Sequence, residues 1–183
     1  TQTGITLTNK SSMGWELGAY FDKDDSITLL SKLAPNDSLF VPNGTALSGT
    51  LTLRPTDDPN YSWQGRKPSF SFAKILSFES RNLLARCKSR KTKSKIFCIL
   101  HLTRPNNVTS HSECNIRIIS PFALENTLST ACKFTIFTKK DGTLNPVWSN
   151  TMMKGERRDI FTLPLTRKLY LQSVIQKSDT TTW

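Results

Sequence analysis

Apolar and polar residues alternate with a period of two along most of this 183-residue chain, as expected for strands with one buried face. The first clear examples are Ile5 and Leu7, then Trp15, Leu17, Ala19 and Phe21. Short polar stretches separate the runs, and Asp141-Gly142 between two of them predicts a hairpin. A helix fits only residues 72–84, where apolar residues come in clusters, and that stretch stays undecided. The sequence therefore predicts an all-β fold of antiparallel strands.

Two parts of the chain align around asparagines that lie roughly 115 residues apart, which indicates a divergent internal repeat. Asn9-Lys-Ser-Ser matches Asn126-Thr-Leu-Ser, and each follows an apolar strand. Beyond these segments, apolar positions with the same spacing correspond: Trp15, Leu17 and Ala19 with Cys132, Phe134 and Ile136. The turns at 35–37 and 154–156 also match. We therefore predict two tandem β-sandwich-like repeats, at residues 1–110 and 111–183.

Asn9 and Asn126 each stand between a strand and a short polar turn. A side-chain amide can both accept hydrogen bonds from the backbone and donate to it, so we interpret both asparagines as structural residues that hold these turns. The alternative, for either residue alone, is an ordinary turn asparagine exposed to water. The matching pair disfavours that alternative.

The formal charge of +11 would attract nucleic acid, anionic lipid or acidic protein segments. Much of the excess positive charge lies in one predicted basic loop, made of Arg86, Lys88, Arg90, Lys91, Lys93 and Lys95. The run contains no aromatic residue, whereas single-strand binders interleave stacking rings with their cations. We therefore interpret it as a solvated loop. Direct docking of this loop on anionic membrane or nucleic acid remains the alternative function, and nucleic acid is the less favoured partner.

The residues that carry catalytic or metal chemistry are sparse. The four cysteines, at 87, 98, 114 and 132, form no Cys-x-x-Cys pair, and only His101 and His111 could join them, so we predict no metal site. We expect Cys98 and Cys132 to be small buried side chains, although two disulfides remain possible. Neither histidine lies near a nucleophile motif, and no phosphate loop is present. We predict no cofactor and no enzymatic activity.

Five glycosylation triplets, beginning at Asn9, Asn36, Asn43, Asn60 and Asn107, leave a secreted protein as an alternative compartment. No run of residues reaches the roughly 20 apolar positions of a membrane-spanning helix. The first residues lack the features of a signal peptide, and the start at Thr1 suggests an excised fragment.

Several short motifs occur in an order that resembles a known family. Ile119-Ser-Pro-Phe-Ala-Leu-Glu-Asn-Thr-Leu128 is followed by Trp148 and Gly155, and Arg54-Pro55 is followed by Tyr61-Ser-Trp63. This order resembles the adaptor-binding region of the vacuolar protein sorting thirteen proteins, which are bridge-like lipid-transfer proteins at organelle contacts. The resemblance covers nearly the whole chain. The first repeat departs from it by having threonines in place of the Pro121 region, and the basic loop has no counterpart that we can assign.

The resemblance implies a fragment of an array of β-rich repeats, each with one such asparagine, here Asn9 and Asn126. Repeats of this kind capture short Pro-x-Pro motifs in organelle-specific adaptor proteins. They thereby place the parent protein on mitochondria, endosomes or the vacuole, so we expect a cytoplasmic protein at the periphery of organelle membranes. The lipid-conducting groove belongs to another part of such proteins, and we expect no lipid transport by this fragment.

An extended peptide ligand requires only a free strand edge and apolar pockets. The second repeat offers the best candidates, with Phe137 nearby: Phe134, Phe161, Leu163, Leu169, Tyr170 and Leu171. Alternate residues of a strand face opposite sides, so we expect either Leu169 with Leu171, or Tyr170, to contact the ligand. The alternative is that most of the six are core residues.

Overall fold

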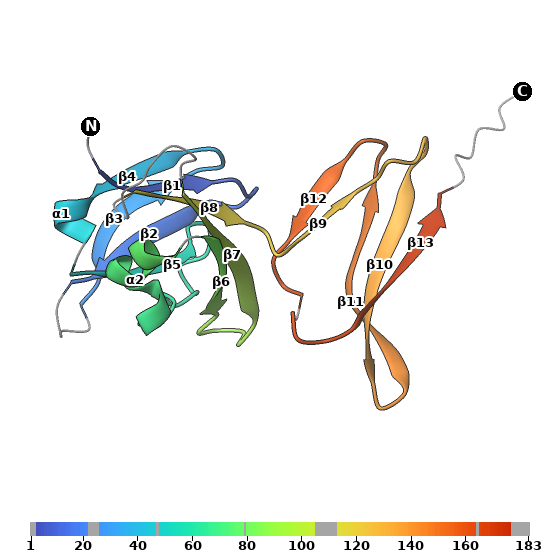
Figure 1. Cartoon of the computed structure of the whole chain (residues 1–183). Helices are drawn as coiled ribbons and strands as arrows, with labels where there is room; N and C mark the ends of the chain where they lie inside the picture. The colour runs from blue at the N-terminus through green and yellow to red at the C-terminus, as the bar shows by residue number, and fades with distance from the viewer. Residues whose placement is uncertain are drawn as a thin grey trace, which may run out of the picture. The chain divides into compact units, whose positions relative to one another are not determined.

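A computed structural model describes residues 3–21, 26–46, 48–78, 80–104, 113–163 and 165–176. Strands make up nearly all of its regular structure, so the predicted all-β class is confirmed (Figure 1). The chain divides into two compact units, Thr1–Pro121 and Phe122–Trp183. Asn107 and His111 lie outside the described residues.

The first unit contains a five-stranded sheet with the order β4-β1-β8-β7-β6. Its members are β1 (Gly4–Asn9), β4 (Ser38–Pro42), β6 (Ser80–Lys88), β7 (Lys95–Thr103) and β8 (Cys114–Ile119). Neighbours are antiparallel except for β1 and β8, which run parallel. The expectation of antiparallel pairing throughout is corrected at this one pair, because β8 enters the sheet from a distant part of the chain.

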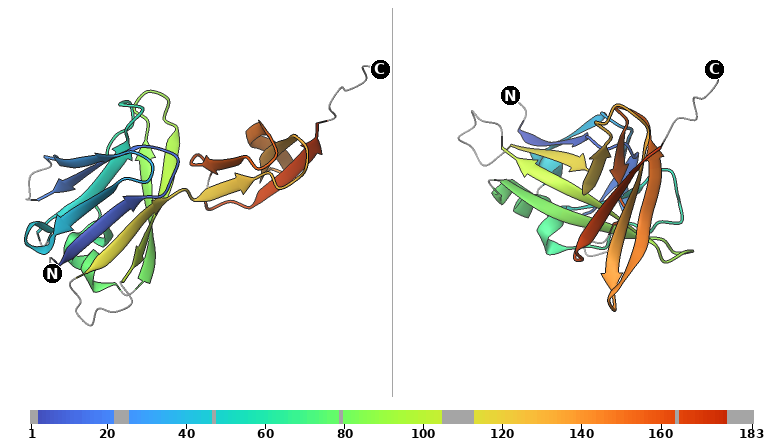
Figure 2. Two further views of the ribbon diagram at one scale, coloured as in Figure 1. Left: turned by 90° about the horizontal axis from the view of Figure 1, so that it is seen from above. Right: turned by 90° about the vertical axis from the view of Figure 1, so that its right-hand side faces the viewer.

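A second sheet of the first unit has the order β3-β2-β5, with β2 (Trp15–Tyr20), β3 (Thr28–Leu33) and β5 (Thr50–Pro55). Both sheets contribute side chains to the core, and their fully buried side chains include Leu7, Leu17, Leu53, Leu100 and Ile116. The Cys87 thiol on β6 donates to the Leu53 carbonyl on β5 at 3.3 Å and so links the two sheets. Further views of the strands are given in Figure 2.

The stretch 72–84, left undecided from sequence, contains both kinds of structure. Helix α2 (Phe72–Ser77) follows the 3-10 turn η1 (Pro68–Phe70), and strand β6 begins at Ser80. Ser71 caps α2, because its hydroxyl accepts a hydrogen bond from the Lys74 amide at 3.2 Å. The apolar spacing changes from helical to alternating within the stretch, which explains why one pattern fitted it poorly. A short helix, α1 (Asn43–Ala46), also precedes β5.

The second unit also contains two sheets. One has the order β11-β10-β13, with β10 (Cys132–Lys140), β11 (Thr143–Met152) and β13 (Leu169–Ile175). The other pairs β9 (Phe122–Glu125) with β12 (Arg157–Ile160). Asp141 and Gly142 join β10 to β11 with φ angles of 50° and 82°, as the predicted hairpin requires. The buried core comprises Cys132, Phe134, Ile136, Met152, Ile160 and Leu163.

The division between the units lies after Pro121, whereas we placed it after residue 110. Strand β8 accounts for the difference, because it lies between β1 and β7 inside the first sheet. Its alternating residues indicate a strand but carry no information about which neighbours it pairs with. Only Ser120 and Pro121 separate β8 from β9.

Glu16 connects the three strands of the smaller first-unit sheet. Its carboxylate accepts from Arg54 Nε on β5 at 2.6 Å and lies 3.0 Å from Lys32 Nζ on β3. The Arg54 guanidinium also stacks 4.7 Å from the centre of the Trp63 ring. Burial raises the pKa of Glu16, but the hydrogen bonds from Lys32 and Arg54 outweigh it, and the net pKa lies below the ordinary value of 4.5.

We expect Glu16→Gln to remove an acid-dependent part of the stability. Because folding lowers the pKa of Glu16, its contribution is present above about pH 4.5 and is lost as the pH falls through the folded-state pKa. The neutral variant should lose about 1–2 kcal/mol of unfolding free energy at pH 7 and less at pH 3. Urea unfolding at both pH values measures this. Equal losses at the two pH values would contradict a stabilising role for the ionised Glu16 carboxylate. Glu125→Gln, at an exposed position, serves as the control.

Candidate functional site

Asn9 is fully buried at the end of β1, and its amide is hydrogen-bonded on both sides. Nδ2 donates to the Met13 carbonyl at 2.7 Å and to the Leu33 carbonyl at 3.1 Å. Oδ1 accepts from the Ser11 amide at 3.0 Å and from the Ser11 hydroxyl at 2.8 Å. The side chain therefore joins the turn after β1 to the end of β3. Its burial also excludes glycosylation of the folded chain at this asparagine.

Asn126 is likewise fully buried, and it makes the same kind of bonds in the second unit. Nδ2 donates to the carbonyls of Thr130 at 2.9 Å and Met152 at 2.8 Å, and Oδ1 accepts from the Leu128 amide at 3.1 Å. The partners stand at the same offsets in the turn as those of Asn9. One bond is missing, because Leu128 has no hydroxyl where the first unit has Ser11.

The backbones of the two asparagines also bond to turns that correspond. The Asn9 amide donates to the Asp37 carbonyl at 2.9 Å, and the Asn126 amide donates to the Glu156 carbonyl at 2.9 Å. The residues before these acids, Asn36 and Gly155, have φ angles of 71° and 72°. Both positions require the left-handed region, which asparagine and glycine tolerate best. These are the turns that the sequence alignment paired.

The predicted peptide-binding residues separate into two groups. Phe134, Phe161 and Leu163 are buried, and Leu163 has no exposed surface. Leu169 and Tyr170 are half-buried, whereas Leu171 is 57% exposed. The first three therefore belong to the core of the second unit, which was the alternative for each residue. Only the three residues on β13 remain in reach of a ligand.

Strand β13 is an edge strand, because β10 is its one strand neighbour among the described residues. Leu169 and Leu171 pair with Thr138 and Ile136 and so share the inner face of the sheet. Tyr170 pairs with Phe137 on the outer face, where the Lys168 ammonium lies 5.5 Å from the centre of the tyrosine ring. The free edge therefore presents an aromatic ring on one side and exposed leucine on the other.

The apolar residues of β13 continue to Ile175, beyond the residues that the sequence predicted to contact a peptide. Val174 and Ile175 are 49% and 61% exposed, and neither was among the predicted site residues. The apolar character of residues 169–175 is visible in the sequence. Their exposure is not, because it depends on which strands cover them.

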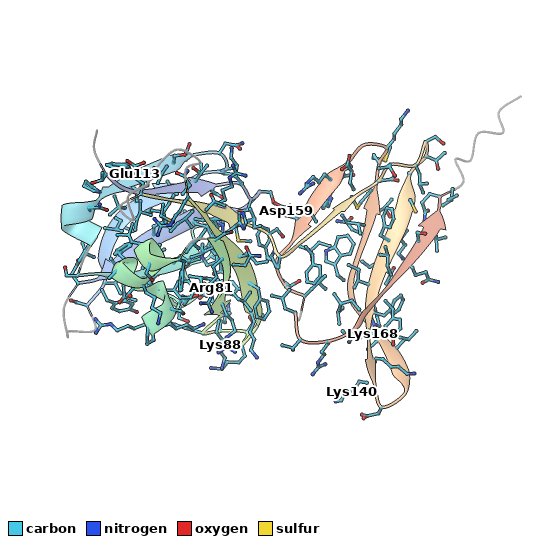
Figure 3. The ribbon with its side chains drawn as sticks, viewed as in Figure 1. Arg81, Lys88, Glu113, Lys140, Asp159 and Lys168 are labelled. Atoms are coloured by element: carbon cyan, nitrogen blue, oxygen red, sulfur yellow. The ribbon has the colours of Figure 1, made fainter. Side chains whose placement is uncertain are left out.

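The predicted basic loop is in fact a hairpin. Arg86 and Lys88 lie on β6 and Lys95 begins β7, so only the remaining three cations lie in the turn (Figure 3 labels Lys88). All six side chains are exposed, and none forms an ion pair within the described part of the chain. The turn is anchored, because the Ser89 amide donates to the Ser94 carbonyl at 2.8 Å and the Arg90 amide to the Asn60 carbonyl at 2.8 Å.

All four cysteines are buried free thiols, as expected for Cys98 and Cys132. Burial raises the pKa of Cys87 to about 12. No cluster of three or more metal-ligating side chains occurs among the described residues. Over the same residues, no helix has the length and apolar content needed to cross a membrane.

The sequence model of the vacuolar-sorting associated protein 13 adaptor binding domain matches residues 2–182. The chain belongs to this family. The resemblance inferred from its motifs is thereby confirmed. VPS13 adaptor binding domains form a binding family, not a catalytic one.

One relative of this adaptor binding domain is the intermembrane lipid transfer protein VPS13 of Chaetomium thermophilum (strain DSM 1495 / CBS 144.50 / IMI 039719). The two are 23% identical over 155 residues, which is 82% of this chain and 5% of that protein. The chain thus corresponds to a small part of the relative's length.

Proposed function

We propose that this chain captures short Pro-x-Pro segments of adaptor proteins along the edge of β13. The observation that supports this most directly is the free edge of β13, with Leu171 exposed on one face and Tyr170 half-buried on the other. A ligand strand can accept hydrogen bonds from this edge and place alternate side chains against the two faces. Membership of the VPS13 adaptor binding domain family supports the same class of partner.

Proline suits such a ligand for a physical reason. It cannot donate a backbone hydrogen bond, but it is rigid and preordered in an extended conformation. Two prolines separated by one residue point to the same side, so both rings can contact one face of β13. The residue between them keeps its N–H group for pairing with the edge.

We further propose that this capture recruits a parent lipid-transfer protein to organelle membranes. The parent would be cytoplasmic and peripheral to the membrane, at contacts that involve mitochondria, endosomes or the vacuole. The activity of the VPS13 relative, intermembrane lipid transfer, supports this proposal. The adaptor that this chain binds would then determine the organelle to which the parent protein is recruited.

A labelled Pro-x-Pro peptide should bind the chain saturably in the micromolar range, and Leu171→Asp should weaken binding about tenfold. The substitution places a charge at an apolar contact, where desolvation costs on the order of 1–2 kcal/mol. Fluorescence anisotropy measures this. Leu144→Asp is the matched control, because Leu144 is 50% exposed on β11, the opposite edge of the same sheet. Absence of saturable binding, or equal loss in both variants, would count against the proposal.

The basic hairpin supports a second candidate function, electrostatic docking on anionic membranes. Its six exposed cations have no ion-pair partner in the described residues. Near an anionic surface each cation contributes about 1 kcal/mol. Charge reversal at Arg90 and Lys91 should therefore abolish sedimentation with phosphatidylserine vesicles and spare peptide binding.

Lys139→Glu with Lys140→Glu, at the β10–β11 hairpin, is the matched control for the vesicle experiment. Both lysines are exposed, so the control tests net charge without altering the basic hairpin. Binding should fall steeply as salt is raised. Equal loss of vesicle and peptide binding in the basic-hairpin variant would show that the two sites are not separate.

A further inference from the structure

The larger sheet of the first unit is free of acidic residues. Its strands β4, β1, β8, β7 and β6 contain no aspartate or glutamate, although the chain has 14 acidic residues. The same strands carry Arg81, Arg86, Lys88, Lys95 and Arg117. None of these cations forms an ion pair within the described part of the chain. The positive charge of this sheet is therefore uncompensated.

The cations nearest the hairpin that joins β6 to β7 lie on the outer face of the sheet (Figure 1). Ala85 and Cys98 pair with each other and are buried, so they mark the inner face. Alternate residues of a strand face opposite sides. Arg86 and Lys88 on β6, and Lys95 on β7, therefore point outward, and all three are exposed.

Apolar side chains lie among these cations on the same face. Phe97 pairs with Arg86, and in the next row Ile99 pairs with Leu84. Leu84 is 39% exposed, whereas Phe97 and Ile99 are half-buried. Cations and apolar side chains on one face suit a membrane interface, where charged head groups lie just outside the acyl chains.

Two lysines at the end of this face stand directly opposite each other. Lys88 on β6 pairs with Lys95 on β7. Like charges at paired positions destabilise a sheet. An anion near both ammonium groups would reduce their repulsion, so the pair favours an anionic partner.

The face of a paired sheet offers a partner only its side chains. Strands β6 and β7 pair along all nine residues of each, so the backbone groups between them are already bonded. A peptide that binds through backbone hydrogen bonds requires a free strand edge. A lipid surface requires only charge and apolar contact, and this face supplies both.

We propose that the outer face of β6 and β7 docks on membranes that contain acidic phospholipid. Leu84 and Phe97 enter the interface, while Arg86, Lys88 and Lys95 contact the head groups. This inference rests on the second candidate function, docking of the basic hairpin on anionic membranes. It adds the face that meets the membrane and an apolar contribution from that face.

A fluorophore whose emission shifts to the blue in apolar surroundings tests the apolar contact. It is attached to Leu84→Cys in the full chain, whose four native thiols are buried. We expect a blue shift when vesicles of phosphatidylserine and phosphatidylcholine in equal amounts are added. The matched control is the same label at Leu29→Cys, because Leu29 is 51% exposed but lies on β3 of the other sheet. The control label should show no shift.

Two arginines of β6 test the charged part of the face. Arg86→Ala should weaken sedimentation with these vesicles about fivefold, as expected for one cation at an anionic surface. Arg81→Ala removes the same charge from the same strand. Arg81 has the opposite parity, since it pairs with buried Leu102, and its guanidinium lies 4.7 Å from the centre of the Phe78 ring. Arg81→Ala should therefore leave sedimentation unchanged, and equal losses in the two variants would overturn the proposal.

The outcomes separate this proposal from the function on which it rests. If the chain sediments with vesicles but the label at position 84 does not shift, the face is wrong and electrostatic docking of the hairpin stands. If the chain does not sediment, both fail. Emission that is already blue-shifted without vesicles would show that protein covers the face. A comparable shift with duplex DNA would indicate a nucleic-acid surface, and either result would overturn the proposal.

Discussion

Replacing Asn9 by aspartate is expected to lower the unfolding free energy of the first unit by about 3 kcal/mol and its melting temperature by roughly 10 °C. Aspartate cannot donate to the Met13 and Leu33 carbonyls, which Asn9 Nδ2 contacts at 2.7 and 3.1 Å. It would also place a carboxylate among carbonyl oxygens at a fully buried position. Thermal unfolding followed by circular dichroism measures the loss.

Asn126→Asp should cause a comparable loss in the second unit, because Asn126 Nδ2 donates to Thr130 and Met152 in the same way. Asn145→Asp is the control, since Asn145 is exposed on β11. Each unit has its own buried core, so each variant should shift the transition of its own unit. A change below about 0.5 kcal/mol at Asn9 would contradict its role as the residue that holds the turn.

Replacing Trp15 by alanine should cost about 4 kcal/mol, the effect of emptying a large buried site. Trp15 is fully buried on β2, and its Nε1 donates to the Ser11 hydroxyl at 3.0 Å. That hydroxyl in turn donates to Asn9 Oδ1 at 2.8 Å. The indole therefore fills the core and also orients the serine that supports Asn9. Urea unfolding gives the free energy directly.

Trp15→Phe separates these two roles, because it keeps an aromatic ring but removes the Nε1–H group. We expect Trp15→Phe to lower the unfolding free energy by a smaller amount, about 1–2 kcal/mol. Most of this loss should be absent when Trp15→Phe is made in a chain that already carries Ser11→Ala. Trp148→Ala, at a half-buried position in the second unit, should leave the first unit unchanged. Additive effects of Trp15→Phe and Ser11→Ala would show that the hydrogen bond contributes nothing.

The peptide site shows where prediction from sequence reached its limit. All six predicted residues are apolar, but three of them lie in the core and three lie on β13. Alternation along β13 correctly separated Tyr170 from Leu169 and Leu171, because neighbouring residues of a strand must face opposite sides. It could not show that β13 is an edge strand, nor that the alternation extends to the exposed Ile175.

The sequence by itself determined the all-β class, the Asp141-Gly142 hairpin and the equivalence of Asn9 and Asn126. Each of these depends on local chemistry: side-chain alternation, the φ angles of two turn residues, and an amide next to a bend. The tertiary structure decided that β8 pairs in parallel with β1, that the first unit ends after Pro121, and that β13 is an edge strand among the described residues. Strand partners are chosen by backbone hydrogen bonds, and since every residue except proline offers the same N–H and C=O groups, that choice is fixed by the assembled core.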